Sequence, residues 1–421
     1  AGAGDATAAG KATDRRALAV MVVSHAVQHF YVGGLALTYP LVVVDFHISY
    51  GLLGAVLTVA GLVGGLLQGV AGLVRRSSAR AVLAVQNVGL AAATALGAIA
   101  PGFAVFGAAR CMGAIVSWPQ HPVGSAYLSE RFPGRRGAVL SWHTAGGSLG
   151  TVVVPLIASA VIATAGWRWA LVAIAIPMAA GGVLVWFRLP PDRHTEPEDA
   201  ASAGTRVPLR AVLTRRRVAL ILAAATVAAG GRGLGTISAY LPAYLKTGLH
   251  LSTYEVGGVF TAVMVASVAG PVAAGHLADR FGRGALLVVS YLAGAAALVA
   301  FVFVGSGLAA LVATGVAMGM FAYAESPLLQ AVFADAVGEA AGRAAFGAFF
   351  AIAYGIGALW LAVLGWVIDA FGFRAAFVVM AGSFVMAAAL VVASGSGRAP
   401  RQSGAVRAPV TAPDPDPAGR A

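Results

Sequence analysis

The sequence is poor in charged residues and almost free of cysteine. Only 10% of its 421 residues are charged, whereas a soluble domain carries roughly 25%, so a water-soluble globular fold is excluded. The single cysteine, Cys111, excludes an internal disulfide and suits a small buried side chain. The sequence also lacks a nucleotide-binding loop, a metalloprotease motif and a credible catalytic triad, which argues against an enzyme.

Long apolar runs take up most of the chain. Hydrophobic residues make up 59% of the sequence, and a helix needs about 20 apolar residues to cross a bilayer. Twelve runs approach or exceed this length: 17–44, 51–74, 81–100, 102–127, 137–163, 169–188, 218–245, 254–277, 284–305, 308–334, 343–368 and 373–394. The sequence therefore predicts an all-α membrane protein with twelve transmembrane helices in the lipid bilayer.

The basic residues lie on one side of this predicted topology. If residues 1–16 are cytoplasmic, the inner segments hold the great majority of the 28 Lys and Arg residues, and the outer loops hold only Arg168, Lys246 and Arg374. This asymmetry follows the positive-inside rule. We therefore expect a multi-pass protein of a bacterial-type cytoplasmic (inner) membrane with both termini in the cytoplasm. The net charge of +12 is then topological, and no nucleic-acid partner is implied.

A polar stretch divides the chain into two halves of six runs each. Both halves end in a run that an aromatic-arginine signal opens: Gly166-Trp167-Arg168-Trp169 and Phe371-Gly372-Phe373-Arg374. We interpret the halves as repeats that form two pseudo-symmetric six-helix bundles. The expected organisation is a cytoplasmic N-terminal segment, a first bundle, a cytoplasmic linker, a second bundle and a disordered cytoplasmic tail, at 1–16, 17–188, 189–217, 218–394 and 395–421.

The loop after the eighth run contains a long motif. Residues 275–284 read Gly-His-Leu-Ala-Asp-Arg-Phe-Gly-Arg-Gly, which resembles the G-x-L-A-D-R-x-G-R-R/K loop of the major facilitator superfamily. The two motif glycines suit a close approach and a tight turn, and the aspartate can accept hydrogen bonds at a helix N-terminus. The resemblance implies a conformational latch made by Asp279, Arg280, Arg283, Gly275 and Gly282. The equivalent loop at 72–80 lacks the aspartate.

This resemblance covers residues 14 to 395 and implies the major facilitator fold, with secondary transport by alternating access. Arg110 and the loop at 129–137 resemble features of many bacterial members. A narrower resemblance, to fosmidomycin-resistance-type and monocarboxylate-type bacterial carriers, rests on the stretch from His25 to Phe30 and on residues 230–275.

Few ionisable or strongly polar side chains lie deep in the runs, and such residues usually mark functional sites. They are His25, Gln28, His29, Arg110, His121, His143, Arg232 and Glu325. All but His143 belong to runs 1, 4, 7 and 10, which resemble the helices that line the central cavity of major facilitator carriers. Because Arg110, Ser117 and His121 also follow helical spacing, we expect one polar cavity at mid-membrane.

The two deep arginines and the deep acid suggest a charge-based mechanism. Arg232 lies among glycines, and its guanidinium suits a carboxylate or phosphonate ligand; the alternative is a structural arginine that bonds the carbonyls of a loosened helix. Arg110 is interpreted in the same way as a substrate ligand, and the alternative is a structural ion pair of the kind that the family resemblance implies. Glu325 is expected to carry the coupling proton, and the alternative is a residue that satisfies a helix break.

The histidines are assigned to the substrate site rather than to a metal. His25 and His29 have metal-ligand spacing, but neither a cysteine cluster nor a second carboxylate is nearby to complete a site. We therefore expect no metal and assign substrate hydrogen bonding to His25, Gln28, His29 and His121. The Gly146–Gly150 run matches G-x-S-x-G, but in an apolar run it suits close helix packing better than a nucleophile.

The predicted function is proton-coupled secondary transport of a small organic anion by a protein that is not an enzyme, is monomeric and uses no cofactor besides the proton. The alternative within this class is proton-antiport multidrug efflux. The deep residues offer two arginines against one acid, which disfavours a cationic drug. A non-transporting membrane sensor or a membrane enzyme is the alternative from another class.

Overall fold

The computed structural model describes residues 2–69, 78–192, 209–338 and 342–397. Within these ranges the chain is helical and contains no strand, as the sequence predicts. Most of the predicted disordered tail, the middle of the linker and most of the loop at 72–80 lie outside the described residues.

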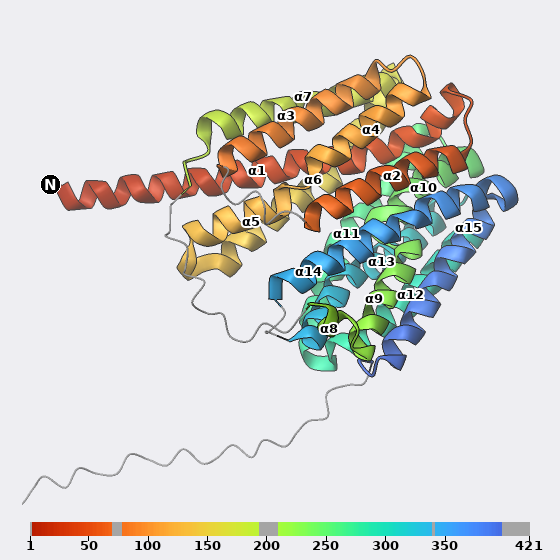
Figure 1. Ribbon diagram of the computed structural model, residues 1–421. Helices are drawn as coiled ribbons and strands as arrows, with labels where there is room; N and C mark the ends of the chain where they lie inside the picture. The colour runs from red at the N-terminus through yellow and green to blue at the C-terminus, as the bar shows by residue number, and fades with distance from the viewer. Residues whose placement is uncertain (1, 70–77, 193–208, 339–341, 398–421) are drawn as a thin grey trace, which may run out of the picture.

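The first half of the chain forms one bundle, coloured red to yellow-green in Figure 1. The first helix extends the predicted first span backwards through most of the segment 1–16 and projects from the bundle. It packs against the fifth and sixth spans, and the third span packs against the sixth. The helices are α1 (Gly2–Asp45), α2 (Tyr50–Gly69), α3 (Ala79–Ala98), α4 (Phe103–Ser117), α5 (Gln120–Arg131), α6 (Arg136–Ala165) and α7 (Trp167–Arg188).

The second half forms the other bundle, coloured green to blue. Its helices are α8 (Leu209–Leu213), α9 (Arg216–Ala228), α10 (Ser238–Ala243), α11 (Thr253–Phe281), α12 (Arg283–Phe303), α13 (Leu308–Val337), α14 (Gly342–Phe350) and α15 (Leu359–Ala393). Short 3₁₀ and π segments join α9 to α10 and α14 to α15. These segments interrupt the seventh and eleventh predicted spans.

Ten helices of the described residues are long and apolar enough to cross a membrane, and two local features account for the difference from twelve. The fourth predicted span is divided into α4 and α5 at Trp118 and Pro119, because proline has no N–H for the helical ladder. The stretch Ala345–Ala393 has 49 residues, enough for about 74 Å of helix, which is more than two bilayer cores. It bends at Gly372, where φ is 81° and ψ is 172°, and therefore supplies two spans.

Backbone geometry supports the repeat. Gly166 has φ 89° and ψ 169°, nearly the values at Gly372, so the aromatic-arginine signals mark equivalent turns. His47 and His250, which follow the first and seventh spans, are the non-glycine residues with positive φ in the described chain, at 51° and 56°. They lie in the matching stretches Phe46-His47-Ile48-Ser49 and Leu249-His250-Leu251-Ser252. The sequence contains this repeat, but a search for hydrophobic runs alone does not find it.

The halves meet through two pairs of helices that the repeat relates. α2 packs against the segment from Ala351 into α15, and α6 packs against α11. Small residues bring the first pair together, since a Cβ on Gly65 would lie 2.6 Å from the backbone of Gly355. We name the side of the molecule that carries Tyr50 and Asp369 the far face and the opposite side the terminal face.

An aspartate closes the far face between the halves. The Asp369 carboxylate accepts hydrogen bonds from the backbone N–H of Tyr50 at 2.9 Å and of Gly51 at 2.7 Å. The Tyr50 hydroxyl lies 2.8 Å from Oγ1 of Thr247, and the hydroxyl of Thr58 donates to the Ala358 carbonyl. These bonds tie the beginning of α2 to the second half.

Candidate functional site

A cavity of about 350 Å³ lies between the two halves. Its walls come from α1, α2 and α4 of the first half, and from the broken seventh span and the segment 354–361 of the second. Both predicted arginines line it, and its lining contains no carboxylate. The polar lining residues are Tyr31, Tyr39, Arg110, Ser117, Arg232, Thr236, Ser238 and Tyr354.

Arg232 lies at a break in the seventh span. Residues 229–231 form a 3₁₀ turn, Arg232 has φ −64° and ψ 131°, and a π segment with non-helical Leu234 and Gly235 follows. The freed carbonyls find side-chain donors, because the Thr236 hydroxyl lies 2.8 Å from the Gly230 oxygen and the Ser238 hydroxyl lies 2.8 Å from the Gly233 oxygen. Such compensation is what a membrane interior requires of a broken helix.

The Arg232 guanidinium is held on all three nitrogens. Its Nε donates to Oε1 of Glu325 at 2.7 Å, Nη1 donates to the Ala353 carbonyl at 2.8 Å, and Nη2 donates to the Ala225 carbonyl at 2.9 Å. The guanidinium carbon also lies 4.5 Å from the centre of the Tyr354 ring. These bonds match the structural alternative for this arginine, which also lines the cavity.

Glu325 is fully buried behind Arg232. Its exposed fraction is 0%, and its second oxygen accepts a hydrogen bond from the Tyr291 hydroxyl at 3.2 Å. Glu325 therefore neutralises the charge of Arg232 in the structure. Tyr291 was not predicted, because an isolated tyrosine in an apolar run carries no signal of its own.

Arg110 has a different environment. Its Nη1 donates to the Tyr31 hydroxyl, and its guanidinium carbon lies 4.9 Å from the Tyr31 ring centre and 6.0 Å from that of Tyr39. Its Nε is buried without a hydrogen-bond partner, and no carboxylate in the described part of the chain forms an ion pair with it. The tyrosines were missed, although Tyr31, Leu35 and Tyr39 follow one helical face.

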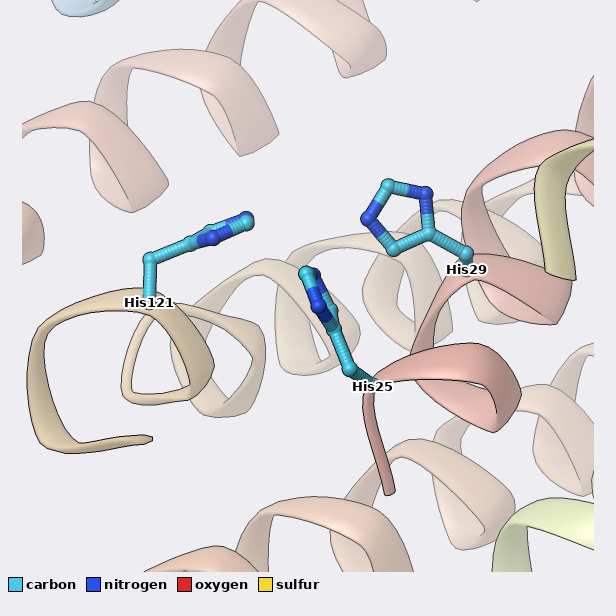
Figure 2. Close-up of side chains that lie close together, drawn as sticks. All are labelled: His25, His29 and His121. Carbon is cyan, nitrogen blue, oxygen red and sulfur yellow. The ribbon is translucent and has the colours of Figure 1, made fainter. Parts of the chain in front are cut away.

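The histidines form a second site beside the cavity. The lining of the 350 Å³ cavity does not include His25, Gln28, His29 or His121. Instead the His25 ring centre lies 4.7 Å from that of His29, 5.0 Å from that of His121 and 4.2 Å from that of the stacked His143. Figure 2 shows the rings of the first three converging from α1 and α5. The amide oxygen of Gln28 is buried without a partner.

The expected single cavity is therefore wrong, and the polar residues divide into two places. Helical spacing fixes the face of a helix on which a side chain lies but not its depth in the membrane. Arg110 lies on α4 and lines the cavity, whereas His121 lies on α5, beyond the break at Trp118 and Pro119, and is absent from the lining.

Only some residues of the motif at 275–284 have the geometry or contacts that the sequence predicts. Gly282 has φ 86° and makes the expected tight turn, and Arg283 forms an ion pair with Asp335 on α13 at 2.7 Å. Asp279 is exposed and has no hydrogen-bond partner among the described residues. The expected close approach at Gly275 is wrong for this conformation, because a Cβ there would meet nothing within 4 Å.

In the first half the loop at 72–80 contains no aspartate, but an aspartate that follows α7 forms a hydrogen bond with the end of this loop. Asp192 Oδ2 accepts a hydrogen bond from the backbone N–H of Ala79, at the start of α3, at 3.1 Å. Arg131 on α5 pairs with Asp14 at 2.9 Å and donates to the Pro191 carbonyl at 3.2 Å. No motif predicts these contacts, because their partners are far apart in the chain.

The comparison with curated proteins finds similarity to a transporter. The glycine betaine/proline/ectoine/pipecolic acid transporter OusA of Dickeya dadantii (strain 3937) is 28% identical over 186 residues, which are 40% of this chain and 37% of that protein. The match thus spans well under half of either chain.

Solved structures share the fold over most of the chain. A variant of the nucleoside transporter NupG has a TM-score of 0.77 at 15% identity, and the match covers 91% of this chain and 99% of that one. The D-xylose-proton symporter has a TM-score of 0.72 at 16% identity, with 91% and 99% covered. A bacterial homologue of the human lysosomal transporter Spinster, in an inward-facing and unoccupied conformation, has a TM-score of 0.69 at 14% identity, with 91% and 96% covered.

A family model places the chain more firmly than any one relative. The model described as Major Facilitator Superfamily matches residues 21–307 and 233–415, which together span nearly the whole helical region. The chain therefore belongs to the Major Facilitator Superfamily and is a multi-pass membrane transporter rather than an enzyme.

Proposed function

We propose that this transporter moves a small organic anion, of the carboxylate or phosphonate class, by proton-coupled alternating access. The observation that carries the proposal is Arg110, a guanidinium on the cavity wall with no carboxylate partner in the described chain. A charge without a counter-charge is costly inside a membrane. A carboxylate or phosphonate in the cavity supplies that counter-charge and fits the two-pronged geometry of a guanidinium.

The coupling proton is assigned to Glu325. In the empty site its carboxylate neutralises Arg232 through the 2.7 Å bond. Protonation removes that negative charge, so a substrate anion gains Arg232 as a second cation without competing against Glu325. Anion binding and proton binding then favour each other, which is the coupling that transport against a gradient requires.

The closed far face is assigned to the outside of the cytoplasmic membrane. The Asp369 bonds hold the halves together there, while Asp279 has no hydrogen-bond partner among the described residues and lies on the terminal face, where both chain ends are proposed to lie. In this assignment the structure is an inward-facing state. The outward-facing state exchanges the two interactions: the Asp369 bonds break and the motif at 275–284 latches. The proposed transporting unit is the monomer.

Uptake into proteoliposomes tests the function. Purified protein is reconstituted with an imposed pH gradient, and a panel of monocarboxylates and phosphonates is compared with glycine betaine, proline, a nucleoside and xylose. We expect pH-driven accumulation of a carboxylate or phosphonate and its loss in Arg110→Ala. Glu325→Gln mimics the protonated acid, so it should retain substrate exchange but lose pH-driven accumulation. Accumulation of only neutral compounds, or an unaffected Arg110→Ala, would contradict the proposal.

Drug efflux is the competing function. A lipophilic cation needs acidic or aromatic groups in its site, and the cavity lining contains two arginines and no carboxylate. Tight binding of a lipophilic cation that survives Arg232→Ala would favour efflux over anion transport. The assignment of His25, Gln28, His29 and His121 to substrate hydrogen bonding stays a prediction.

A further inference from the structure

We infer that His25, His29 and His121 form a binding site for a divalent transition-metal ion, with Zn²⁺ as the probe. Their potential ligand nitrogens all lie within 4.8 Å of one another. Two of the residues are one turn apart on α1, and the third comes from α5. Figure 2 shows the three rings around a common space. His121 supplies a third ligand, which the spacing of His25 and His29 in the sequence does not provide.

Hydrogen bonding leaves the outer nitrogen of His25 free to bind a metal. Its Nδ1 lies 2.7 Å from the backbone oxygen of His143. A carbonyl oxygen only accepts, so Nδ1 carries the proton and Nε2 of the neutral ring carries a lone pair. Nε2 is buried and has no hydrogen-bond partner. A metal ligand is typically oriented by such a bond from its other ring nitrogen.

The same argument applies to His29. Its Nδ1 lies 2.6 Å from Oγ1 of Thr151, and that hydroxyl lies 3.0 Å from the Gly147 carbonyl, to which it donates its only proton. Thr151 must therefore accept from His29, which places the ring proton on Nδ1 and a lone pair on Nε2. Two neighbouring histidines thus present lone pairs from their outer nitrogens.

Gly147 keeps the space between these nitrogens open. A Cβ at this position would lie 2.9 Å from Nε2 of His25 and 2.9 Å from Nε2 of His29. Both lone-pair atoms therefore border the small volume that glycine leaves empty. Close helix packing, the expected role of this glycine run, holds for its neighbours, since Gly146 and Gly150 lie against backbone oxygens of α1.

His121 is the adjustable ligand. It is exposed, while the preceding Gln120 is anchored by bonds to its amide oxygen from the Ser24 hydroxyl at 3.2 Å and the Gln86 amide at 2.9 Å. Tetrahedral binding at about 2.0–2.1 Å brings ligand nitrogens to about 3.3 Å from one another. Rotation of the exposed His121 ring closes the site from 4.8 Å. Three histidines leave a fourth position for water.

The donor set selects the class of ion. Neutral imidazoles suit Zn²⁺, Cu²⁺, Ni²⁺ and related ions, whereas Mg²⁺ and Ca²⁺ prefer oxygen ligands. Among the described residues, no carboxylate belongs to this cluster. We therefore expect Zn²⁺ to bind and Mg²⁺ not to compete.

The test is calorimetric titration of Zn²⁺ into purified full-length protein in lipid nanodiscs. The protein carries a histidine-free affinity tag and is first stripped with a chelator. We expect one Zn²⁺ per chain with a dissociation constant at or below about 1 µM, and a weakening of about 100-fold in His121→Ala. His276→Ala, which removes an exposed histidine on α11, is the matched control and should bind as the wild type does.

Two further variants separate coordination from folding. Thr151→Val removes the partner that orients His29 and should weaken Zn²⁺ binding about 10- to 100-fold. Gly147→Ala should block the site, whereas Gly258→Ala adds a methyl group where nothing lies within 4 Å and should bind normally. Absence of Zn²⁺ binding below about 100 µM in the wild type, or wild-type affinity in His121→Ala, overturns the site. Arg110→Ala should retain Zn²⁺, so this test and that of anion transport can fail separately.

Discussion

Arg110 and Arg232 occupy the two halves of the molecule and face one cavity, yet their surroundings differ. Each guanidinium lies against a tyrosine ring, at 4.9 Å for Arg110 and 4.5 Å for Arg232. Arg232 also has a buried carboxylate and two backbone carbonyls. Arg110 has a tyrosine hydroxyl and a buried Nε without a partner.

The two halves of a repeat can thus have similar backbones and still give their buried arginines different partners. The second half satisfies its charge internally, because Glu325 lies where Arg232 reaches it. The first half leaves the charge of Arg110 without a carboxylate partner among the described residues. In the proposed mechanism Arg110 recognises the anion in every protonation state, while Arg232 becomes available only when Glu325 is protonated.

The largest expected effect is on stability, from separating the buried pair. Glu325→Ala leaves the Arg232 guanidinium buried at 5% exposure without its counter-charge, which costs about 3–5 kcal/mol. Replacing both residues, as in Arg232→Met with Glu325→Leu, should recover most of that loss. The apparent melting temperature of purified protein measures both effects. A Glu325→Ala protein as stable as the wild type would mean that Glu325 and Arg232 do not form an ion pair in solution.

The next largest effect is on substrate anion binding, and here we expect Arg110 to matter more than Arg232. Arg110→Ala should weaken substrate anion binding about 100-fold, equivalent to about 2.7 kcal/mol, with little loss of stability because no carboxylate is left unpaired. Arg110→Lys keeps the charge but loses the two-pronged geometry, so we expect an intermediate loss. Isothermal calorimetry with the substrate found by uptake provides the measurement. Equal losses of binding in Arg110→Ala and Arg232→Ala would erase the proposed division between the halves.

A third effect concerns the two faces. Asp369→Asn weakens two charge-assisted bonds, each worth about 1.5–3 kcal/mol, and should shift the population away from the conformation with the far face closed. Asp279→Asn should shift it the other way, because this aspartate has no hydrogen-bond partner in the described part of the chain and is proposed to latch the opposite state. Spin-label distances across each face report both shifts. Unchanged distances in both variants would separate these aspartates from the conformational exchange.

The smallest effect should be the same in both halves. Gly166 and Gly372 have φ of 89° and 81°, and an added Cβ meets nothing within 4 Å at either position. Since ψ is 169° and 172°, replacement by alanine costs only the strain of a backbone conformation that is essentially restricted to glycine, about 1–3 kcal/mol. Melting temperatures of Gly166→Ala and Gly372→Ala should fall by similar amounts. Clearly different losses would show that the two turns are not equivalent.

Sequence reasoning worked where the signal is local in the chain. A hydrophobic run predicts a span because length and hydropathy are properties of consecutive residues, and Gly282 was predicted because a tight turn needs its φ. It failed at Gly275, since close approach depends on a neighbouring helix. It also missed Tyr31, because an aromatic residue counts as apolar until a charge is found beside it.

The apolar spans, the repeat of six and six, and the ionisable residues deep in the spans can all be located from the sequence alone. The pairing of Glu325 with Arg232 rather than Arg110, and the approach of His121 to His25 and His29, become apparent only in the packed structure. A helical pattern gives the face of a helix on which a side chain lies, whereas an ion pair or a cluster of three histidines also depends on which second helix comes close. These contacts arise only when the helices pack.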